Sequence, residues 1–177
     1  MPAPADRPRR LFVLRHAKSS WSNAQLADHD RPLAPRGRRA AEALAAHVAT
    51  IDPPPALVLC STARRAQDML EPVRSRLPDS TEVLIEDDLY GAPAPLILAR
   101  LRRIPDTTPS VLVVGHNPGL DDLVRSLGRD GDPGLIARVH TKFPTGALAT
   151  LTFAGSWQAL GSGPATLEAF VVPGDLG

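Results

Sequence analysis

Two basic side chains end the first apolar segment of the sequence. In LFVLRHAKSSW, residues 11–21, four apolar residues are followed at once by Arg15 and His16. Both groups are costly to bury without a partner, and a bound anion would be a suitable partner. A guanidinium presents a planar set of donors that matches phosphate oxygens, and a neutral imidazole can attack phosphorus.

Other reactive side chains follow other apolar segments in the same way. Ser61 and Arg65 come after LVLC, the acidic residues 86–88 come after EVLI, and His116 comes after VLVVG. Each of these alone has an ordinary explanation as a helix charge, a turn or a helix end. Because ligands of open parallel sheets bind beyond the carboxyl ends of the strands, the joint placement predicts one shared site.

The chemistry of such a site would be phosphoryl transfer. His16 would attack phosphorus and form a phosphohistidine that water then hydrolyses. His116, protonated under the influence of the phosphate charge, would donate to an equatorial oxygen. Arg15 and Arg65 would neutralise the anion, helped by helix N-termini after Thr62 and Asn117. A carboxylic acid could protonate the leaving group.

The elements needed to position these groups follow from the hydrophobic pattern. Six short apolar segments predict strands, at 10–15, 56–60, 82–86, 110–115, 147–153 and 166–172. The first four are nearly continuous in apolar character, as parallel strands covered on both faces are. Helices are expected over 35–49 and over 94–103. Another begins at about residue 62, with Pro72 as a kink or break, and a fourth follows HNPG and ends at Gly128. The last two strands look antiparallel. We therefore expect an α/β protein with three α/β/α layers and a mostly parallel sheet of about six strands.

Composition narrows the classes of function. The chain has 177 residues and a net charge of +1, and 4% of its residues are aromatic. This size predicts a single domain over 1–177, with 1–9 as a disordered lead. The balanced charge and few aromatics argue against nucleic acid and membrane partners. Cys60 is the single cysteine and no secretion signal precedes the first strand, so a cytoplasmic protein is expected. The sequence shows no metal-ligand spacing and no cofactor-binding loop, so neither a metal nor a cofactor is expected.

Several motifs together resemble those of the histidine phosphatase superfamily, the phosphoglycerate mutase-like fold. LRHAKSSW resembles its Arg-His-Gly signature, CSTARRAQDM its Ser-x-x-x-Arg-Ala motif, and VVGHNPGLDDLV its second-histidine motif. The resemblance implies the fold and identifies Arg65, not Arg64, as the phosphate-binding arginine. DDLYGA resembles the stretch that carries the proton donor in the mutases, which picks Asp87 as the acid. Asp88, or no carboxylate at all, is the alternative.

Within the superfamily the chain is most similar to the small SixA-type phosphohistidine phosphatases. Ala17 replaces the usual glycine, Ser19 falls where the signature has its serine, and Asn117 stands where acid phosphatases carry an acidic donor. The short connecting segments leave little room for a cap over the site. The resemblance therefore implies that Ser19 and Asn117 join Arg15, Arg65 and His116 in binding substrate. It also implies that the substrate is a phosphorylated side chain on a protein, such as phosphohistidine on a phosphotransfer domain.

Other interpretations stay open on the sequence alone. Within the family, the chain could be a small-molecule phosphomonoesterase or a phosphoglycerate mutase-like enzyme acting on a phosphorylated metabolite. From another class, it could be a phosphate-binding interaction module without turnover. The sequence also leaves open whether Lys18 faces the phosphate or the solvent, and His29 is interpreted as a polar loop residue rather than a metal ligand.

Overall fold

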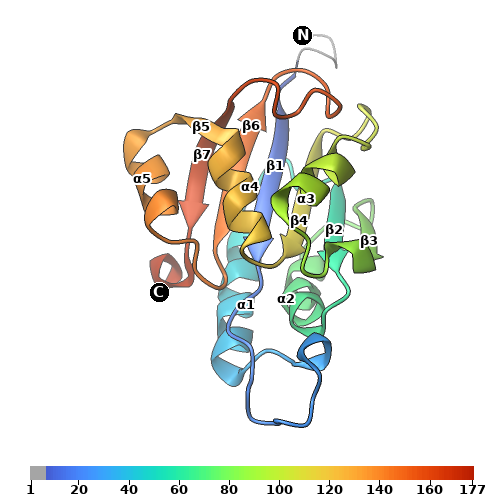
Figure 1. Cartoon of the computed structure of the whole chain (residues 1–177), viewed down its shortest axis with the longest axis vertical. Helices are drawn as coiled ribbons and strands as arrows, with labels where there is room; N and C mark the ends of the chain where they lie inside the picture. Colours follow the sequence, from blue (N-terminus) through green and yellow to red (C-terminus); the bar gives the residue numbers. More distant parts are fainter. Residues whose placement is uncertain (1–6) are drawn as a thin grey trace.

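The chain folds around one central sheet covered by helices on both faces (Figure 1). The computed structural model describes residues 7–177. The strands are β1 (Arg9–Arg15), β2 (Leu57–Ser61), β3 (Glu82–Glu86), β4 (Ser110–Gly115), β5 (Gly128–Gly131), β6 (Leu148–Phe153) and β7 (Ala165–Val171). The helices are α1 (Pro35–Val48), α2 (Arg64–Arg74), α3 (Ala94–Leu101), α4 (Gly119–Leu127) and α5 (Pro133–Thr141), with short 3-10 turns at Asp28–Asp30, Asp87–Leu89 and Pro173–Leu176.

The sheet has the order β3-β2-β4-β1-β6-β7-β5. Strands β3, β2, β4 and β1 run parallel, and β6 is antiparallel to both β1 and β7. All six predicted strands are present, and the predicted antiparallel pair at the end of the chain is confirmed. The expected three-layer α/β architecture with a mostly parallel sheet is thus what the chain adopts.

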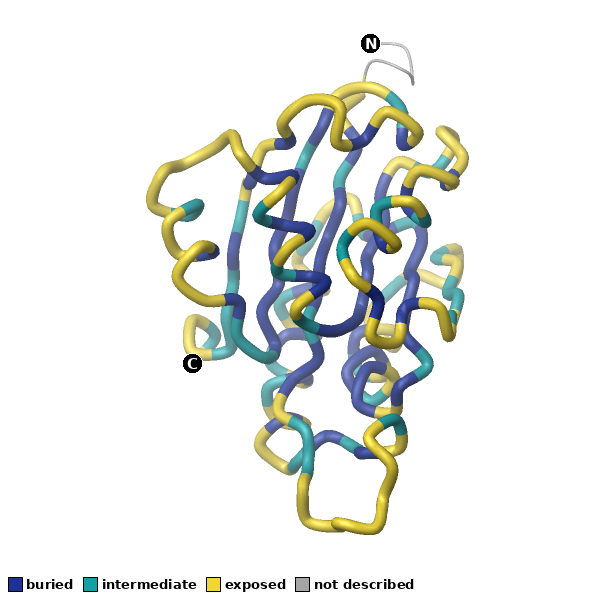
Figure 2. The backbone as a smooth tube through the Cα atoms, viewed as in Figure 1, coloured by how far each residue is buried: buried dark blue, intermediate teal, exposed yellow. Residues whose placement is uncertain are grey.

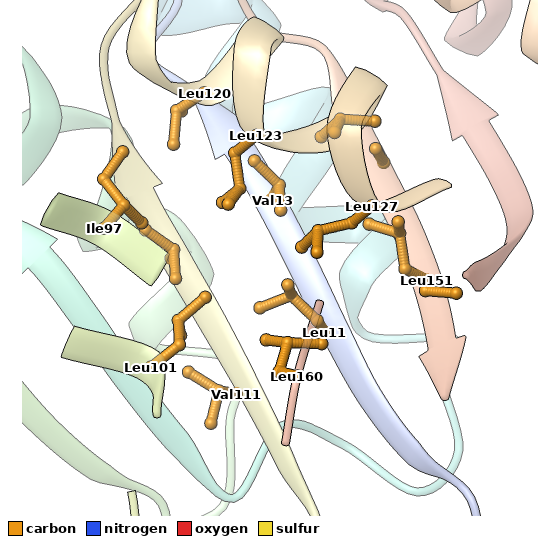
Figure 3. Packing of buried hydrophobic residues seen from close by; sticks show 14 of the residues in the cluster. Leu11, Val13, Ile97, Leu101, Val111, Leu120, Leu123, Leu127, Leu151 and Leu160 are labelled. Atoms are coloured by element: carbon orange, nitrogen blue, oxygen red, sulfur yellow. The ribbon is translucent and has the colours of Figure 1, made fainter. Parts of the chain in front are cut away.

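Alternation along β1 explains the three layers. Leu11 and Val13 face a core formed with α3, α4 and α5, whereas Phe12 and Leu14 face a second core formed with α1 and α2. Successive side chains of a strand point to opposite faces of its sheet, so a strand apolar at every position has to be covered twice. Figure 3 shows the first of these cores, where Leu120, Leu123 and Leu127 of α4 meet β1.

Two elements were not predicted. Strand β5 has the sequence GRDG, in which only Gly128 is buried, and it pairs with β7 at the edge of the sheet. Helix α5 begins after Asp132, whose side chain caps it by accepting from the backbone N–H of Leu135 at 3.0 Å. Neither segment carries a periodic apolar signal of useful length, because both lie at the solvent-exposed margin of the sheet. Over residues 7–177 the sheet therefore has seven strands rather than six.

Other details of the prediction need correction. Strand β3 is an edge strand with partly or fully exposed side chains, not a strand buried on both faces. Helix α2 contains Pro72 and ends only at Arg74, two residues later. Of the predicted lead 1–9, residues 1–6 lie outside the described part, but Arg9 belongs to β1. Its buried guanidinium donates to the carbonyls of Asp106 and Gly155, which explains why the strand starts one residue early.

The carboxyl ends of β1, β2 and β4 lie together at one end of the sheet (Figure 1). The segment that follows β1 runs out from this end as an exposed loop before α1 begins, and it is the yellow loop farthest from the sheet in Figure 2. The other connections here are a few residues long, and no capping subdomain is inserted between residues 7 and 177. Among these residues, every helix is too short or too polar to cross a bilayer.

Gly119, the first residue of α4, has no room for a side chain. A Cβ at Gly119 would stand 2.0 Å from the carbonyl oxygen of Ala92 and 3.1 Å from Cδ1 of Ile97. We predict that Gly119→Ala lowers the free energy of unfolding by at least about 2 kcal/mol, because the backbone at the start of α4 must move away. Urea unfolding measures this directly. Gly163→Ala is the matched control, since nothing lies within 4 Å of a Cβ there, and equal stability of the two variants would contradict the prediction.

Candidate active site

The site lies at the carboxyl ends of the parallel strands, where the sequence places it. The parallel register of β1 and β4 sets Arg15 opposite Gly115, and the backbone N–H of His16 donates to the carbonyl of Gly115 at 3.2 Å. The residues that follow these strands are therefore neighbours. The ring centroids of His16 and His116 are 5.3 Å apart, and both side chains are buried.

The tautomer of His16 is fixed by its backbone partner. Nδ1 lies 2.7 Å from the carbonyl oxygen of Ala17. Since a carbonyl oxygen can only accept, Nδ1 carries the proton and Nε2 keeps its lone pair. Nε2 in turn accepts a hydrogen bond from Nε of Arg65 at 3.3 Å. His16 thus presents an unprotonated, oriented nitrogen beside a guanidinium, which is the arrangement a nucleophile toward an anionic phosphoryl group needs.

His116 is held from the other side by Ser61. Its Nε2 lies 2.8 Å from Oγ of Ser61, and that oxygen also accepts from the backbone N–H of Ala63 at 3.2 Å. Ser61 can donate its hydroxyl proton to Nε2 of His116, and in that tautomer the ring proton is on Nδ1. Nδ1 is buried and finds no hydrogen-bond partner among residues 7–177. A donor in that position fits an oxygen of a bound oxyanion.

Arg15 contributes a second such donor. Its Nη1 donates to the carbonyl of Phe143 at 3.0 Å, whereas its buried Nε has no partner in the described part of the chain. Burial lowers the pKa of Arg15, and the nearby Asp121 raises it in part, but a guanidinium stays charged at neutral pH. Two of the three buried, unpartnered side-chain nitrogens between residues 7 and 177 thus belong to this one site.

Burial also sets the protonation of both histidines. Loss of solvation lowers the pKa of His16 to about 4, and the charges of Arg65 and Arg15 act in the same direction. The pKa of His116 is lowered to about 3, again chiefly by burial and then by His16 and Arg65. Both rings are therefore neutral at pH 7 without an anion. Net positive charge of the site comes from the guanidinium groups, and a bound dianion would favour protonation of an imidazole.

A carboxylate that the sequence did not point to completes the site. Asp28 lies in the loop between β1 and α1, and its Oδ2 accepts from Nη2 of Arg65 at 3.0 Å and from the hydroxyl of Tyr90 at 2.6 Å. Its Oδ1 accepts from Nη1 of Arg31 at 2.7 Å, and its backbone carbonyl accepts from Nη1 of Arg65 at 2.7 Å. The loop thus holds the outer face of Arg65.

Asp28 is a strong carboxylate in these surroundings. The hydrogen bond from Tyr90 and the contacts with Arg65 and Arg31 lower its pKa to about 2, against a smaller opposing effect of burial. The same hydrogen bond raises the pKa of Tyr90. The ring of Tyr90 also stands edge-on to His116, with centroids 5.6 Å apart. Asp28 is therefore ionised at neutral pH, where it can hold a cation or compete with an anion but cannot act as an acid.

Comparison with known proteins agrees with this geometry. The family model of the histidine phosphatase superfamily (branch 1) matches residues 11–90. An uncharacterized protein of Mycobacterium tuberculosis is 37% identical over 162 residues, which cover 90% of this chain and 99% of the relative. The chain belongs to the histidine phosphatase superfamily.

Solved structures of this superfamily share the whole fold. A protein of Nakamurella multipartitia, provisionally assigned as a phosphohistidine phosphatase SixA, is 34% identical with a TM-score of 0.81, over 98% of this chain and 99% of that one. The protein histidine phosphatase SixA complexed with tungstate is 25% identical with a TM-score of 0.76, over 95% of this chain and 99% of that one. The predicted membership of the superfamily and the likeness to SixA-type structures are thereby confirmed.

The structure brings Arg15, His16, Arg65 and His116 together, whereas the other predicted site residues make contacts of their own. Asp87 accepts from Oγ1 of Thr62 at 2.8 Å, and Thr62 is hydrogen-bonded to Nε2 of His29 at 2.9 Å. Asp87 therefore makes its hydrogen bond to Thr62, and among residues 7–177 no hydrogen bond joins it to the imidazole of His16 or His116. Its role as the acid stays a prediction. Asp88 lines a different cavity, with Glu86 and Arg100.

The two predicted polar ligands, Ser19 and Asn117, make hydrogen bonds within the chain. Ser19 accepts from Nη2 of Arg31, so it anchors the residue that holds Asp28. The amide of Asn117 donates to the carbonyl of Phe143 at 2.9 Å, the same carbonyl that Arg15 uses, and its oxygen accepts from the backbone N–H of Asp121 at 3.3 Å. Both side chains thus hold neighbouring parts of the site, and their contact with substrate stays a prediction.

Protonation of the two buried imidazoles gives a first test. We predict that His16 titrates near pH 4 and His116 near pH 3 in the free protein, and that tungstate raises both values because a bound anion stabilises imidazolium. Nitrogen chemical shifts of the rings measure both effects. The urea-unfolded chain is the control, where histidine titrates near its ordinary pKa of about 6.5. Two rings already charged at pH 6 in the folded protein would contradict the prediction.

The lowered pKa values of the two histidines also make the free energy of unfolding depend on pH. Because the folded pKa of His16 lies below its unfolded value, the unfolded chain takes up the proton first as pH falls. Stability is therefore full above about pH 6.5 and declines between pH 6.5 and 4, by on the order of 3 kcal/mol for His16. Urea unfolding between pH 7 and 4 checks this. His16→Gln should remove about half of the decline, because the lowered pKa of His116 makes a similar contribution over that range.

Asp28 gives a second test. Replacing it by Asn keeps the backbone carbonyl on Arg65 but removes a negative charge from the anion site. We predict that Asp28→Asn tightens inhibition by inorganic phosphate about fivefold, as expected for removing a repulsion of about 1 kcal/mol. Asp30→Asn is the control, because Asp30 pairs with His29 and not with Arg65. Weaker phosphate inhibition in Asp28→Asn would show that positioning of Arg65 outweighs the repulsion.

Proposed function

We propose that this protein is a metal-independent phosphatase that forms a phosphohistidine intermediate on His16 and removes phosphate from phosphohistidine on proteins. One observation carries the proposal: the unprotonated Nε2 of His16 lies against Nε of Arg65, within one cluster with His116 and Arg15. The chain's own residues supply the nucleophile and the positive charge that a phosphoryl group requires.

In the first step Nε2 of His16 attacks phosphorus in line with the leaving group. A bond forms between Nε2 and phosphorus, and the bond between phosphorus and the substrate nitrogen breaks. The substrate imidazole leaves with that electron pair as a neutral ring, its other nitrogen having taken a proton from solvent. Arg15 and Arg65 hold the charge on the equatorial oxygens, and Nδ1–H of His116 donates to one of them.

In the second step water attacks phosphorus and the bond to Nε2 of His16 breaks. The electron pair returns to Nε2, inorganic phosphate leaves, and the proton released by water passes to the phosphate and solvent. Nδ1 of His16 keeps its proton throughout, because it is held by the carbonyl of Ala17. Neither step needs a carboxylic acid in contact with the leaving group, which agrees with the ionised state of Asp28.

The form of the site supports a protein substrate. A long loop follows β1, but no capping subdomain is inserted at the strand ends between residues 7 and 177, so a site here is bordered by loops rather than covered by a cap. A phosphorylated side chain can reach such a site, whereas a small metabolite gains most from enclosure. The likeness to the protein histidine phosphatase SixA supports the same substrate class. The partner we propose is a phosphorylated protein, such as a phosphotransfer domain. We place both proteins in the cytoplasm, where the buried thiol of Cys60 would stay reduced.

Trapping of the intermediate tests the mechanism. Rapid quenching with a ³²P-labelled phosphohistidine protein is expected to label His16, and His16→Ala should show neither label nor turnover. Arg65→Ala should lower kcat/KM by at least about 100-fold, as for removal of an oxyanion-stabilising donor. Arg64→Ala is the matched control, because that exposed arginine pairs weakly with Asp68 at 3.9 Å, outside the cluster, and it should change kcat/KM less than twofold.

The outcomes separate the alternatives. Full turnover of His16→Ala would exclude the mechanism, and loss of turnover with a chelator would exclude metal independence. A higher kcat/KM for a phosphorylated metabolite than for phosphohistidine proteins would indicate a small-molecule phosphomonoesterase or mutase instead. Phosphate binding without any turnover would indicate an interaction module.

A further inference from the structure

The only two lysines of the chain lie around one pocket. Lys18 and Lys142 are 124 positions apart in a sequence that otherwise uses arginine for its positive charges. Both line a surface pocket of about 390 Å³ together with Arg36 of α1. The remaining walls come from the segments at 144–145 and 172–174, near the end of α5 and the last 3-10 turn. Three positive charges from three parts of the chain thus converge on one cavity.

No negative charge accompanies them. No carboxylate lines the pocket, and within residues 7–177 the side chains of Lys18, Arg36 and Lys142 make no ion pair or hydrogen bond. Asp175, the acidic residue next to this wall, forms a salt bridge with Arg138 at 3.0 Å. Elsewhere in the protein arginines commonly pair with carboxylates. Bringing like charges together without a counterion costs free energy, which an anionic ligand would recover.

The backbone adds to the positive character of the pocket. Helix α1 has fourteen residues and begins at Pro35, and Ala34 before it provides no side-chain cap. Its first N–H groups therefore lack intrahelical partners and carry the positive end of the helix dipole. The helix start is pressed against Lys18, because a Cβ at Gly37 would stand 2.1 Å from the carbonyl oxygen of Lys18. The close approach fixes the helix end beside the lysine.

The pocket shares its walls with the active site. Ala17, which lines the pocket, directly follows the nucleophile His16 and accepts the hydrogen bond that sets its tautomer. Lys142 and Pro144 flank Phe143, whose carbonyl holds Arg15. An anion in the pocket would therefore lie beside the phosphoryl group, on the other side of the segment from His16 to Lys18.

We propose that this pocket is a subsite for acidic side chains of the phosphorylated protein, next to its phosphohistidine; the assignment of the ligand rests on the function proposed above. The exposed positions of Lys18, Arg36 and Lys142 suit it, since carboxylates on a protein surface can approach them without entering an enclosed site. Lysine ammonium groups on flexible stems accept carboxylates in many orientations. The pocket would thus select substrates by charge while the cluster around His16 performs the reaction.

Paired peptides test the proposal. One phosphohistidine peptide carries two Asp residues on each side of the phosphohistidine, and the other carries Asn in their place. We expect the wild-type protein to favour the acidic peptide by about tenfold in kcat/KM, mainly through KM. Lys18→Gln with Lys142→Gln should abolish the preference with kcat unchanged. Arg39→Gln with Arg129→Gln, two exposed arginines outside the pocket, is the control with the same charge change and should keep the preference.

A binding experiment keeps the pocket testable if the proposed function fails. Fluorescence anisotropy with the labelled, unphosphorylated acidic peptide needs no turnover and should show at least fivefold weaker binding to the double lysine variant. Equal binding of the Asp and Asn peptides by the wild type would overturn the proposal, as would a preference that survives both lysine substitutions. If inorganic phosphate binds a second site that the lysine variant loses, while peptide binding is unchanged, the pocket takes free phosphate and the assignment to protein carboxylates is wrong.

Discussion

The parallel pairing of β1 with β4 is the constraint on which the site depends. It sets Arg15 opposite Gly115, so the next residue of each strand is a histidine and the two imidazoles become neighbours. The pairing holds because every residue of 11–14 and 111–114 is apolar and buried, with alternate side chains packed into two separate cores. A shift of this register by one residue would exchange the faces of the strand and would also part His16 from His116. Packing on both faces of the sheet thus protects the geometry of the chemistry.

Burial at the strand ends then decides the charge of each group. Imidazoles lose their protons when they are desolvated beside guanidinium groups, whereas the guanidinium groups themselves stay charged. The result is two neutral imidazoles inside a positively charged site. The hydrogen bonds that fix the ring orientations go to a backbone carbonyl for His16 and to a serine hydroxyl for His116, neither of which brings a negative charge. Attraction for an anionic phosphoryl group is thereby retained.

Within residues 7–177, the loop between β1 and α1 provides the carboxylate that pairs with an arginine of this cluster. Asp28 joins Arg65, Arg31 and Tyr90, and Arg31 is itself anchored by Ser19. The chain of contacts runs from the segment just after His16, through the loop, to Arg65. Because Asp28 is largely exposed and Arg65 is buried, an incoming anion can take over contacts of Arg65 from the loop. The same loop leads into α1, whose start lines the lysine pocket, so a single segment borders both proposed anion sites.

The sequence by itself determined the layers, the six principal strands and the four residues Arg15, His16, Arg65 and His116. Apolar runs report burial directly, and reactive residues that directly follow such runs must gather at one end of a parallel sheet. Motif spacing also distinguished Arg65 from Arg64. Strand β5 and helix α5 were not predicted, because elements at the edge of a sheet bury few side chains and so show little apolar periodicity. Only the tertiary structure decided four other features. These are the place of Asp28, the hydrogen bonds of Ser19 and Asn117, the hydrogen bond from Thr62 to Asp87, and the pocket shared by the two lysines. Each depends on where an irregular loop or a chain segment far away in sequence comes to lie, and side-chain direction in loops follows no periodic pattern that a sequence displays.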